Sequence, residues 1–281
     1  FFELLWNEHL QYEKLKEADQ MKNQFIDVAA HELRTPVQPI IGLSEVLSST
    51  INDTKQRELL DVIVRNAKRL QRLTEDILDV TKIESHSLNL KKERFDLTEL
   101  ISNTIQDATG QSEKVNNGKL KVVFYNHDND KQSNIIYADK PRITQVLLNL
   151  LNNAIKFTEE GTISVKIRSS SRQNNKDDNI IVSVQDTGDG IDPEILPRLF
   201  TKFATKSEKG TGLGLFICKS IVEAHGGRMW AENNANTTLE KRTRGATFYF
   251  SLPLVNESSV AAINQHKQQK QDDDSNQWRR K

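Results

Sequence analysis

Apolar residues near the start of the chain recur every seven positions. The repeat runs through Ile26, Leu33, Ile40 and Leu47, with Ala29, Pro36 and Leu43 beside it. Two interleaved sets of this kind are typical of a helix whose apolar seam packs against other helices. We therefore expect one long helix over residues 3–47.

A second helix with the same repeat is expected over residues 55–84. Its seam consists of Ile63, Leu70 and Ile77, flanked by Leu59, Asn66, Leu73 and Val80. The polar turn at 48–54 joins the two helices into an antiparallel hairpin. Because such a hairpin cannot bury both apolar stripes alone, we expect two copies to form a four-helix bundle. The alternative is a monomer whose hairpin packs on the rest of the chain.

After residue 85, helical and alternating patterns follow one another, which indicates an α/β sandwich with helices on one face of a sheet. We expect helices over 97–115, 140–158 and 212–225, and strands over 119–125, 134–138, 163–167, 180–184, 228–232 and 246–252. The predicted organisation is a coiled-coil helix (1–20), a hairpin domain (21–85), a linker (86–94), an α/β domain (95–255) and a disordered polar tail (256–281).

Composition narrows the possible functions. The 281 residues include 39 basic and 39 acidic side chains, so nothing favours nucleic-acid binding by electrostatics. The single cysteine, Cys218, excludes an internal disulfide and fits a reducing compartment. No run approaches the roughly 18 apolar residues that span a bilayer. The chain begins with Phe1, so we expect a cytoplasmic fragment whose membrane anchor, if there is one, lies upstream.

His31 occupies a position that suits a chemically modified residue. With Ile26 as the first position of the heptad, His31 falls on the outermost face of the helix, beside Glu32 and one turn before Thr35. Pro36 and Pro39 remove helical hydrogen bonds just beyond it, so we expect a bend there. The alternative is an ordinary solvated surface histidine.

Two glycine-bearing segments of the α/β domain could hold phosphate. One is Asp186–Gly190 after a predicted strand, and the other is Gly210–Leu215 at the start of a predicted helix. Glycines at a helix N-terminus allow backbone N–H groups to approach an anion closely. Neither segment matches the P-loop or the dinucleotide fingerprint, so simple turns remain the alternative.

A polar stripe on an otherwise apolar helix supports a ligand site. Asn149, Asn153 and Lys156 share one face of the predicted helix at 140–158. Two amide oxygens and an ammonium group can hold a metal ion and a phosphate together. A plain polar helix face is the alternative, but the surrounding leucines predict a largely buried helix, and buried amides need partners.

In this order the motifs resemble the catalytic core of sensor histidine kinases of two-component systems, over residues 20–255. The matching segments are His31–Pro36 (H box), Asn149–Phe157 (N box), Asp186–Gly190 (G1 box), Leu199–Phe203 (F box), Gly210–Leu215 (G2 box) and Gly245–Phe248 (last motif). The resemblance implies a dimeric four-helix-bundle domain followed by an ATP-binding α/β sandwich of the Bergerat type.

The same resemblance assigns catalytic roles. It implies a protein-histidine kinase in which His31 accepts the γ-phosphoryl group of ATP and Glu32 acts as general base. Thr35 would position water for dephosphorylation of the partner. The implied partners are a second copy of the chain and the receiver domain of a response regulator, whose aspartate takes the phosphoryl group. Phosphorylation within or between copies is left open.

ATP and Mg²⁺ are the implied cofactors. Asn153 would coordinate Mg²⁺ with support from Asn149, Lys156 would contact phosphate, and Asp186 would accept from the adenine amino group. The remaining implied ATP-binding residues are Phe157, Gly188, Gly190, Ile191, Phe203, Lys206, Gly210, Thr211, Gly212, Leu213, Gly214, Leu215 and Thr247.

Some features depart from the family pattern or favour other readings. The segment between Phe203 and Gly210 is short, so the cation that longer lids provide would come from Lys202, Lys206 or Lys209. Because a polar tail follows the α/β domain in this sequence, we expect a separate response regulator as the partner. A hydrolytic ATPase of the same superfamily would carry glutamate where this chain has Asn149. A non-catalytic dimeric nucleotide-binding scaffold is the other alternative, and it predicts a missing acceptor or metal ligand.

Overall fold

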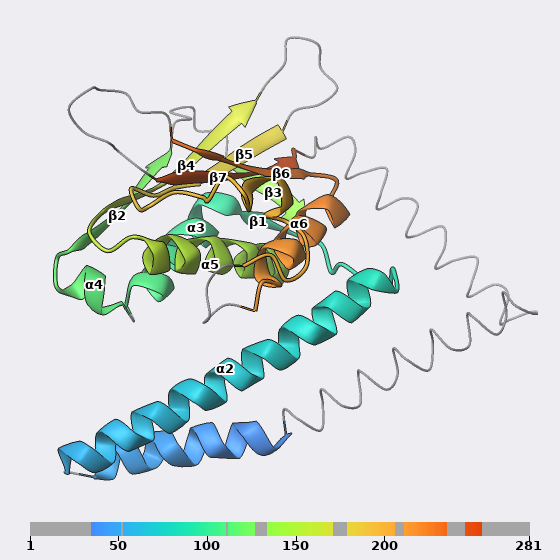
Figure 1. The fold of residues 1–281 in the computed structure, drawn as a ribbon. Coiled ribbons are helices and arrows are strands. Elements are labelled where there is room, and N and C mark those ends of the chain that lie inside the picture. Colours follow the sequence, from blue (N-terminus) through green and yellow to red (C-terminus); the bar gives the residue numbers. More distant parts are fainter. Residues whose placement is uncertain are drawn as a thin grey trace, which may run out of the picture. The chain divides into compact units, whose positions relative to one another are not determined.

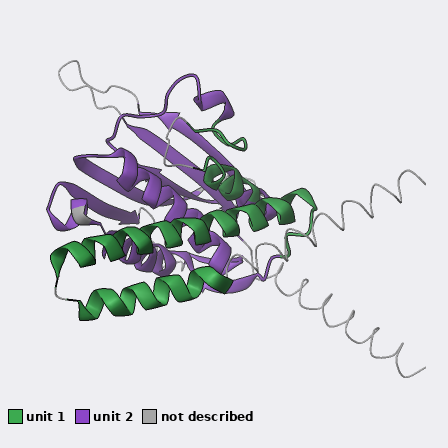
Figure 2. Cartoon of the chain, turned by 60° about the horizontal axis from the view of Figure 1, so that its bottom comes forward, with its two compact units in different colours: residues 1–89, 199–220 green, residues 90–198, 221–281 purple. Residues whose placement is uncertain are grey.

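The structure is a computed structural model that describes residues 35–51, 53–110, 112–126, 134–170, 179–205, 211–234 and 245–254. The chain divides into two compact units (Figure 2). Unit 1 comprises residues 1–89 and 199–220, and unit 2 comprises residues 90–198 and 221–281. Each unit is described by itself. The predicted coiled coil over 1–20 and the tail over 256–281 lie outside the described residues.

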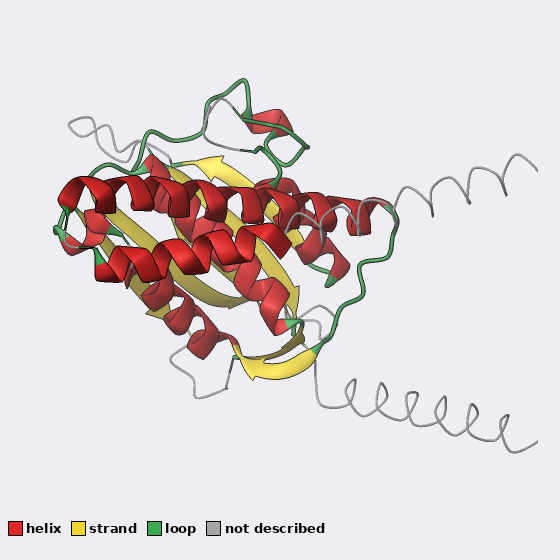
Figure 3. Ribbon diagram, turned by 90° about the horizontal axis from the view of Figure 1, so that it is seen from below, coloured by secondary structure: helices red, strands yellow, loops and turns green. Residues whose placement is uncertain are grey.

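Unit 1 contains the predicted helical hairpin. A helix over 35–50 runs beside α2 (Thr54–Glu84), as Figure 3 shows from below. The side chain of Asp53 caps α2 by accepting from the backbone N–H groups of Lys55 (2.8 Å) and Gln56 (3.1 Å). Such a cap satisfies donors that have no partner within the helix, and so it fixes where α2 begins.

The two helices of the hairpin pack through small and branched apolar side chains. Val37 and Ile41 on the first helix form a buried cluster with Ala67 on α2. The first helix continues through Pro39 as far as residue 50, three residues beyond the predicted end. The expected bend near His31 falls outside the described residues.

Unit 2 is an α/β sandwich built on a five-stranded sheet of order β2-β4-β5-β7-β6. Its strands are β2 (Leu120–Asn126), β4 (Gly161–Ser170), β5 (Asn179–Gln185), β6 (Arg228–Asn233) and β7 (Ala246–Pro253). β2 and β4 are parallel, and the other pairs are antiparallel. Alternate residues are fully buried, for example Ile163, Val165 and Ile167 on β4, so the sequence alternation correctly predicted the covered face.

Helices cover this inner face of the sheet. α3 (Leu97–Gly110) and α5 (Lys140–Phe157) pack against each other beneath the strands in Figure 1. A short α4 (Glu113–Asn116) follows α3, a 3₁₀ turn η1 (Leu196–Arg198) follows β5, and α6 (Gly214–Ala224) precedes β6. The predicted fold class, a helical hairpin followed by an α/β sandwich, is therefore confirmed. Among the described helices none is long and apolar enough to cross a membrane.

Two details differ from the prediction. The helix expected over 97–115 ends at Gly110, and a separate turn starts at Ser112, whose carbonyl accepts from the N–H groups of Val115 (3.2 Å) and Asn116 (3.0 Å). In addition, β1 (Glu93–Asp96) pairs with β3 (Ile135–Ala138) in a two-stranded sheet. The end of the segment predicted as a linker is thus part of unit 2, because its backbone hydrogen bonds are made with β3.

A buried histidine is hydrogen-bonded to the residue that caps the start of α5. The Nε2 of His225 accepts from the backbone N–H of Asp139 (3.0 Å), and its Nδ1 donates to the carbonyl of Ile221 (2.8 Å). Asp139 caps α5 by accepting from the N–H of Arg142 (3.1 Å), and its other carboxylate oxygen accepts from the N–H of Lys91 (2.7 Å). These bonds require a neutral ring with its proton on Nδ1. Burial lowers the pKa of His225, and the charge of Lys92 lowers it further.

Protonation of His225 should therefore destabilise unit 2. The unfolded chain takes up a proton near pH 6.5, but the folded chain resists it, so stability present above that pH is lost as the pH falls below it. We expect the melting temperature of the chain to drop between pH 7.5 and 5.5. In His225→Gln, whose amide accepts a hydrogen bond without titrating, the drop should be smaller. Equal drops in both proteins would contradict this account.

Candidate functional site

The polar face of α5 lies as the sequence predicted. The Nδ2 of Asn153 donates to the Oδ1 of Asn149 at 3.0 Å, and both side chains are half-buried, while Leu150 and Leu151 behind them are fully buried. One turn further, the Nζ of Lys156 lies 4.8 Å from the centroid of the exposed Phe157 ring. The amides of Asn149 and Asn153 therefore lie one turn from a cation and an aromatic ring at the C-terminal end of α5.

Lys114 holds this end of α5 in place. Its Nζ donates to the carbonyls of Ile155 (3.4 Å) and Thr158 (3.1 Å), and it pairs with the carboxylate of Glu159 (2.9 Å). A lysine at the end of a helix satisfies carbonyls that have no partner within the helix and complements the helix dipole. The sequence analysis missed Lys114, since nothing local in the sequence links it to a helix about forty residues away.

Asp186 is the buried acid of the site. Its Oδ1 accepts from the N–H groups of Gly188 (2.9 Å) and Ala246 (3.2 Å), while its backbone N–H donates to the carbonyl of Ala246 (2.9 Å). Burial raises the pKa of Asp186, and the two N–H donors counteract this in part. Among the described residues both bonds to the carboxylate end on Oδ1, which leaves Oδ2 for a donor from outside the chain.

A close backbone contact joins this acid to α5. A Cβ on residue 188 would lie 2.3 Å from the carbonyl oxygen of Phe157, so only glycine fits there. Gly188 follows Asp186 by two residues, and Phe157 follows Asn153 by four. The predicted N-box and G1-box residues are therefore brought together within unit 2.

Asparagines that the sequence analysis did not single out complete this part of the site. The side chain of Asn233 makes two hydrogen bonds to the backbone of Ile191. Its Oδ1 accepts from the Ile191 N–H (2.6 Å), and its Nδ2 donates to the Ile191 carbonyl (2.8 Å). Asn234 donates to the carbonyl of Asp186 (2.8 Å) and accepts from the hydroxyl of Thr247 (2.6 Å). The only sequence signal was two adjacent asparagines at the end of a predicted strand.

The F-box and G2-box residues belong to unit 1. Phe203 adopts a left-handed backbone conformation (φ 61°) with its ring 72% exposed, and Gly212 (φ 69°) packs against its backbone. Leu213 is buried, and Gly214 and Leu215 begin α6. These residues and those on α5 thus fall in different units.

Thr211 and Lys202 are engaged by carboxylates of α2 within unit 1. The hydroxyl of Thr211 donates to Asp76 (3.2 Å), and Lys202 pairs with Glu84 while its Nζ lies 5.2 Å from the Phe216 ring. Burial raises the pKa of Asp76 to about 6, against the lowering effect of the Thr211 hydroxyl and of Arg72. Lys202, one of three candidate lid cations, thus already has an acidic partner.

Several predicted site residues lie at or beyond the limits of the described chain. Thr35 is the first described residue and is exposed on its helix. His31, Glu32, Lys206, Lys209 and Gly210 lie outside the described residues.

The residues present fit a nucleotide with a divalent cation. Within the described ranges no group of three or more His, Cys, Asp or Glu side chains could hold a metal ion. On α5, the amide oxygens of Asn149 and Asn153 are polar groups that could hold a cation together with oxygens of a substrate. Amide and phosphate oxygens are suitable ligands for Mg²⁺, which is typically held by few protein groups.

Two family models match the chain. Residues 138–256 match "Histidine kinase-, DNA gyrase B-, and HSP90-like ATPase", which is the part of the chain that contains α5 and Asp186. Residues 21–86 match "His Kinase A (phospho-acceptor) domain", which includes His31 and the hairpin. The predicted domain boundaries themselves stay predictions.

Proteins similar to the chain are regulators and kinases. It is 32% identical over 248 residues to the sensory/regulatory protein RpfC of Xanthomonas campestris, covering 85% of this chain and 32% of RpfC. It is 32% identical over 256 residues to histidine kinase 5 of Arabidopsis thaliana, covering 82% of this chain and 26% of that protein. The chain thus spans about a third or less of the length of these relatives.

Solved structures share the fold. The chain superposes on full-length ShkA in complex with AMPPNP with a TM-score of 0.64 at 25% identity, covering 83% of this chain and 46% of ShkA. It superposes on the Acinetobacter baumannii histidine kinase AdeS with a TM-score of 0.52 at 25% identity, covering 80% of this chain and 98% of AdeS.

Proposed function

The chain belongs to the sensor histidine kinases of two-component systems, and from this premise we propose that it uses ATP to phosphorylate His31. The phosphoryl group then passes to an aspartate of a response regulator. The observation that carries the proposal is the contact of Gly188 with the Phe157 carbonyl, which joins Asp186 to the asparagine face of α5. Acid, amides and lysine together match the polar groups that an adenine nucleotide presents.

Asp186 gives the site its preference for adenine. Its Oδ1 is committed to the backbone N–H groups of Gly188 and Ala246, which fixes the direction of the carboxylate. The other oxygen then accepts from the exocyclic amino group of adenine. A guanine would present a carbonyl oxygen at that position and repel it. Two further residues line the adenine site in this proposal. Ile191 is hydrogen-bonded to Asn233, and Thr247 is hydrogen-bonded to Asn234.

The far end of the nucleotide is bound by α5. Lys156 would contact phosphate, and the amide oxygens of Asn153 and Asn149 would hold Mg²⁺. When bound, Mg²⁺ would supply positive charge against the phosphates, and neutralising their charge is the main electrostatic requirement of phosphoryl transfer. The glycines of the segment ending at Leu215, with Thr211, form the phosphate-binding turn before α6, and Lys206 supplies a lid cation.

His31 is the nucleophile. Its neutral imidazole attacks the γ-phosphorus, and Glu32 takes the proton from the other ring nitrogen as the bond from nitrogen to phosphorus forms. The bond between the γ-phosphorus and the bridging oxygen breaks, and ADP leaves. Thr35, which is exposed and follows His31 by four residues, positions the water that dephosphorylates the response regulator.

The hairpin supports a homodimer. Large apolar side chains remain uncovered on both of its helices, including Leu43 and Leu59, each 66% exposed. A second copy presents two matching helices and would bury these side chains in a four-helix bundle. The response regulator would dock on the polar outer faces of the same hairpin.

Incubation with γ-labelled ATP and Mg²⁺ tests the kinase assignment. We expect an acid-labile, base-stable label on the chain, because phosphohistidine has that stability. His31→Gln should abolish the label, whereas His86→Gln, a change at an exposed residue just after α2, should leave it unchanged. A label that survives His31→Gln would contradict the proposal. Release of inorganic phosphate without any label would favour the hydrolytic ATPase instead.

The role of α5 is testable with two adjacent asparagines. Asn153 is half-buried against Asn149, whereas Asn152 is exposed. Asn153→Ala should slow phosphorylation about a hundredfold and raise the Mg²⁺ concentration required, because a metal ligand at the transferring phosphate is lost. Asn152→Ala should leave both quantities close to wild type. Equal effects of the two variants, measured by initial rates over a Mg²⁺ titration, would count against the assignment.

A further inference from the structure

The uncovered stripe on α2 contains one amide among leucines and isoleucines. Its positions are spaced by four and three residues in alternation, through Leu59, Ile63, Asn66, Leu70, Leu73 and Ile77. Asn66 is exposed, as are its apolar neighbours Ile63 and Leu70. Within the described hairpin this stripe lies on the face adjacent to the Val37–Ile41–Ala67 cluster that joins the two helices, because Ala67 is one residue, or 100°, around the helix from Asn66.

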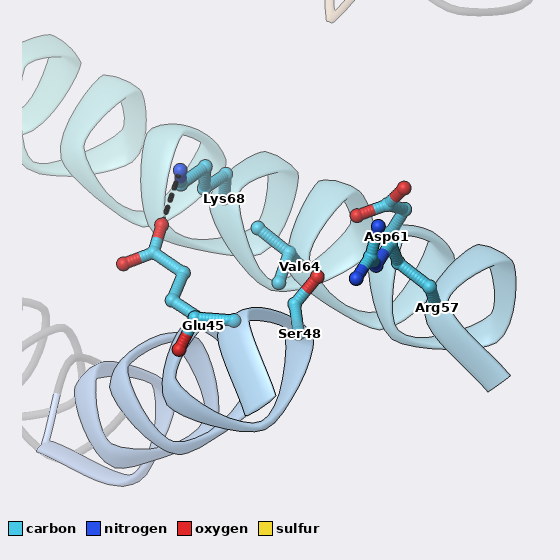
Figure 4. Close-up of a pocket in the computed structure, with 7 residues that line it drawn as sticks. Glu45, Ser48, Arg57, Asp61, Val64 and Lys68 are labelled. Carbon is cyan, nitrogen blue, oxygen red and sulfur yellow. Dashed lines mark hydrogen bonds and ion pairs between the residues drawn. The ribbon is translucent and has the colours of Figure 1, made fainter. Parts of the chain in front are cut away.

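The register of the hairpin shows what lies level with Asn66. The Nζ of Lys68 pairs with the Oε1 of Glu45 at 2.7 Å, and Figure 4 shows the two side chains meeting between the helices. The backbone register follows from the buried cluster, in which Ala67 packs between Val37 and Ile41. It places Ile40 about level with Asn66 and Leu43 about level with Ile63. Ile40 and Leu43 are themselves exposed. Each hairpin therefore offers successive apolar layers and a single layer in which isoleucine stands beside an amide.

The hydrogen bonds of Asn66 are incomplete. Its Nδ2 donates to the carbonyl of Val62 within its own helix (2.8 Å), and its Oδ1 has no partner among the described residues. In water this is harmless, but under a covering apolar surface an unpaired amide oxygen loses its solvation without compensation. Any partner that covers the stripe must therefore provide a donor at this layer.

A second copy of the chain meets this requirement. In a bundle whose two-fold axis runs along the helices, the layer of Asn66 from one chain coincides with the same layer from the other, so two amides share it. A shift by one heptad, or a partner with an apolar residue at this position, would leave each amide among leucines. A single asparagine in an apolar helical seam is known to select register and oligomeric state in this way, at a cost in stability.

We propose that Asn66 determines partner choice in the hairpin dimer by admitting only a second chain that carries an amide in the same layer. The inference rests on the homodimer proposed above. It adds that the dimer discriminates between hairpins of similar apolar pattern, and that this discrimination comes from one residue of α2.

Mixing experiments test this inference. Wild-type chain and an affinity-tagged Asn66→Leu chain are mixed, re-equilibrated and examined by native mass spectrometry. We expect the fraction of mixed dimers to be about tenfold below the statistical value, since each mixed dimer buries one amide without a hydrogen-bond partner. The Asn66→Leu homodimer should melt at a higher temperature than wild type, or form larger oligomers. Asn66→Ala, which also removes the amide, should show the same depletion to a smaller extent.

Arg65→Leu is the matched control, because Arg65 is exposed one residue away and on the outer face of α2. It should form mixed dimers with wild type in the statistical ratio. Statistical mixing of wild type with Asn66→Leu, with unchanged melting temperature, would overturn the role of Asn66 while leaving the dimer intact. A wild-type chain that stays monomeric at tens of micromolar would overturn the dimer itself, and with it this inference.

Discussion

Each helix of the hairpin carries two apolar faces, and the described residues cover only one of them. Val37, Ile41 and Ala67 are buried between the helices, while the heptad positions on the adjacent faces, such as Leu43 and Leu70, remain exposed. Burial of one such side chain contributes about 1.5–3 kcal/mol, so covering a whole stripe that is now in water would strongly stabilise an assembly of hairpins. The proposed dimer follows from this constraint, and so does the need for a polar group that controls which partner is admitted.

The proposed nucleotide site rests on a different principle, which is a helix anchored at both ends. Asp139 and His225 hold the start of α5, and Lys114 holds its last carbonyls. Between these anchors the leucine face is fully buried, so Asn149 and Asn153 have little freedom to move. Side chains that bind a cation and phosphates gain from such preorganisation, because less conformational entropy is lost when the ligand binds.

The sequence predicted those features whose signal is local and periodic. The heptads located α2 and its exposed stripe, and the 3.6-residue period placed Asn149 and Asn153 on one face of α5. Alternation located the strands of the central sheet. Features that depend on distant segments were missed: β1 exists because it pairs with β3, and Lys114, Asn233 and His225 become informative only once their partners are in place. The helix expected to continue to residue 115 instead ends at Gly110, because glycine favours the end of a helix and the prediction followed the apolar period past it.

Sedimentation equilibrium of the whole chain tests the central constraint most directly. The account predicts twice the mass of one chain at micromolar concentration. It predicts a single-chain mass when Leu43→Asp and Leu70→Asp place one charge in the exposed stripe of each helix, with the fold of unit 2 unchanged by circular dichroism. A wild-type chain that sediments as a monomer at tens of micromolar would show that the exposed stripes do not drive self-association, and would contradict the account.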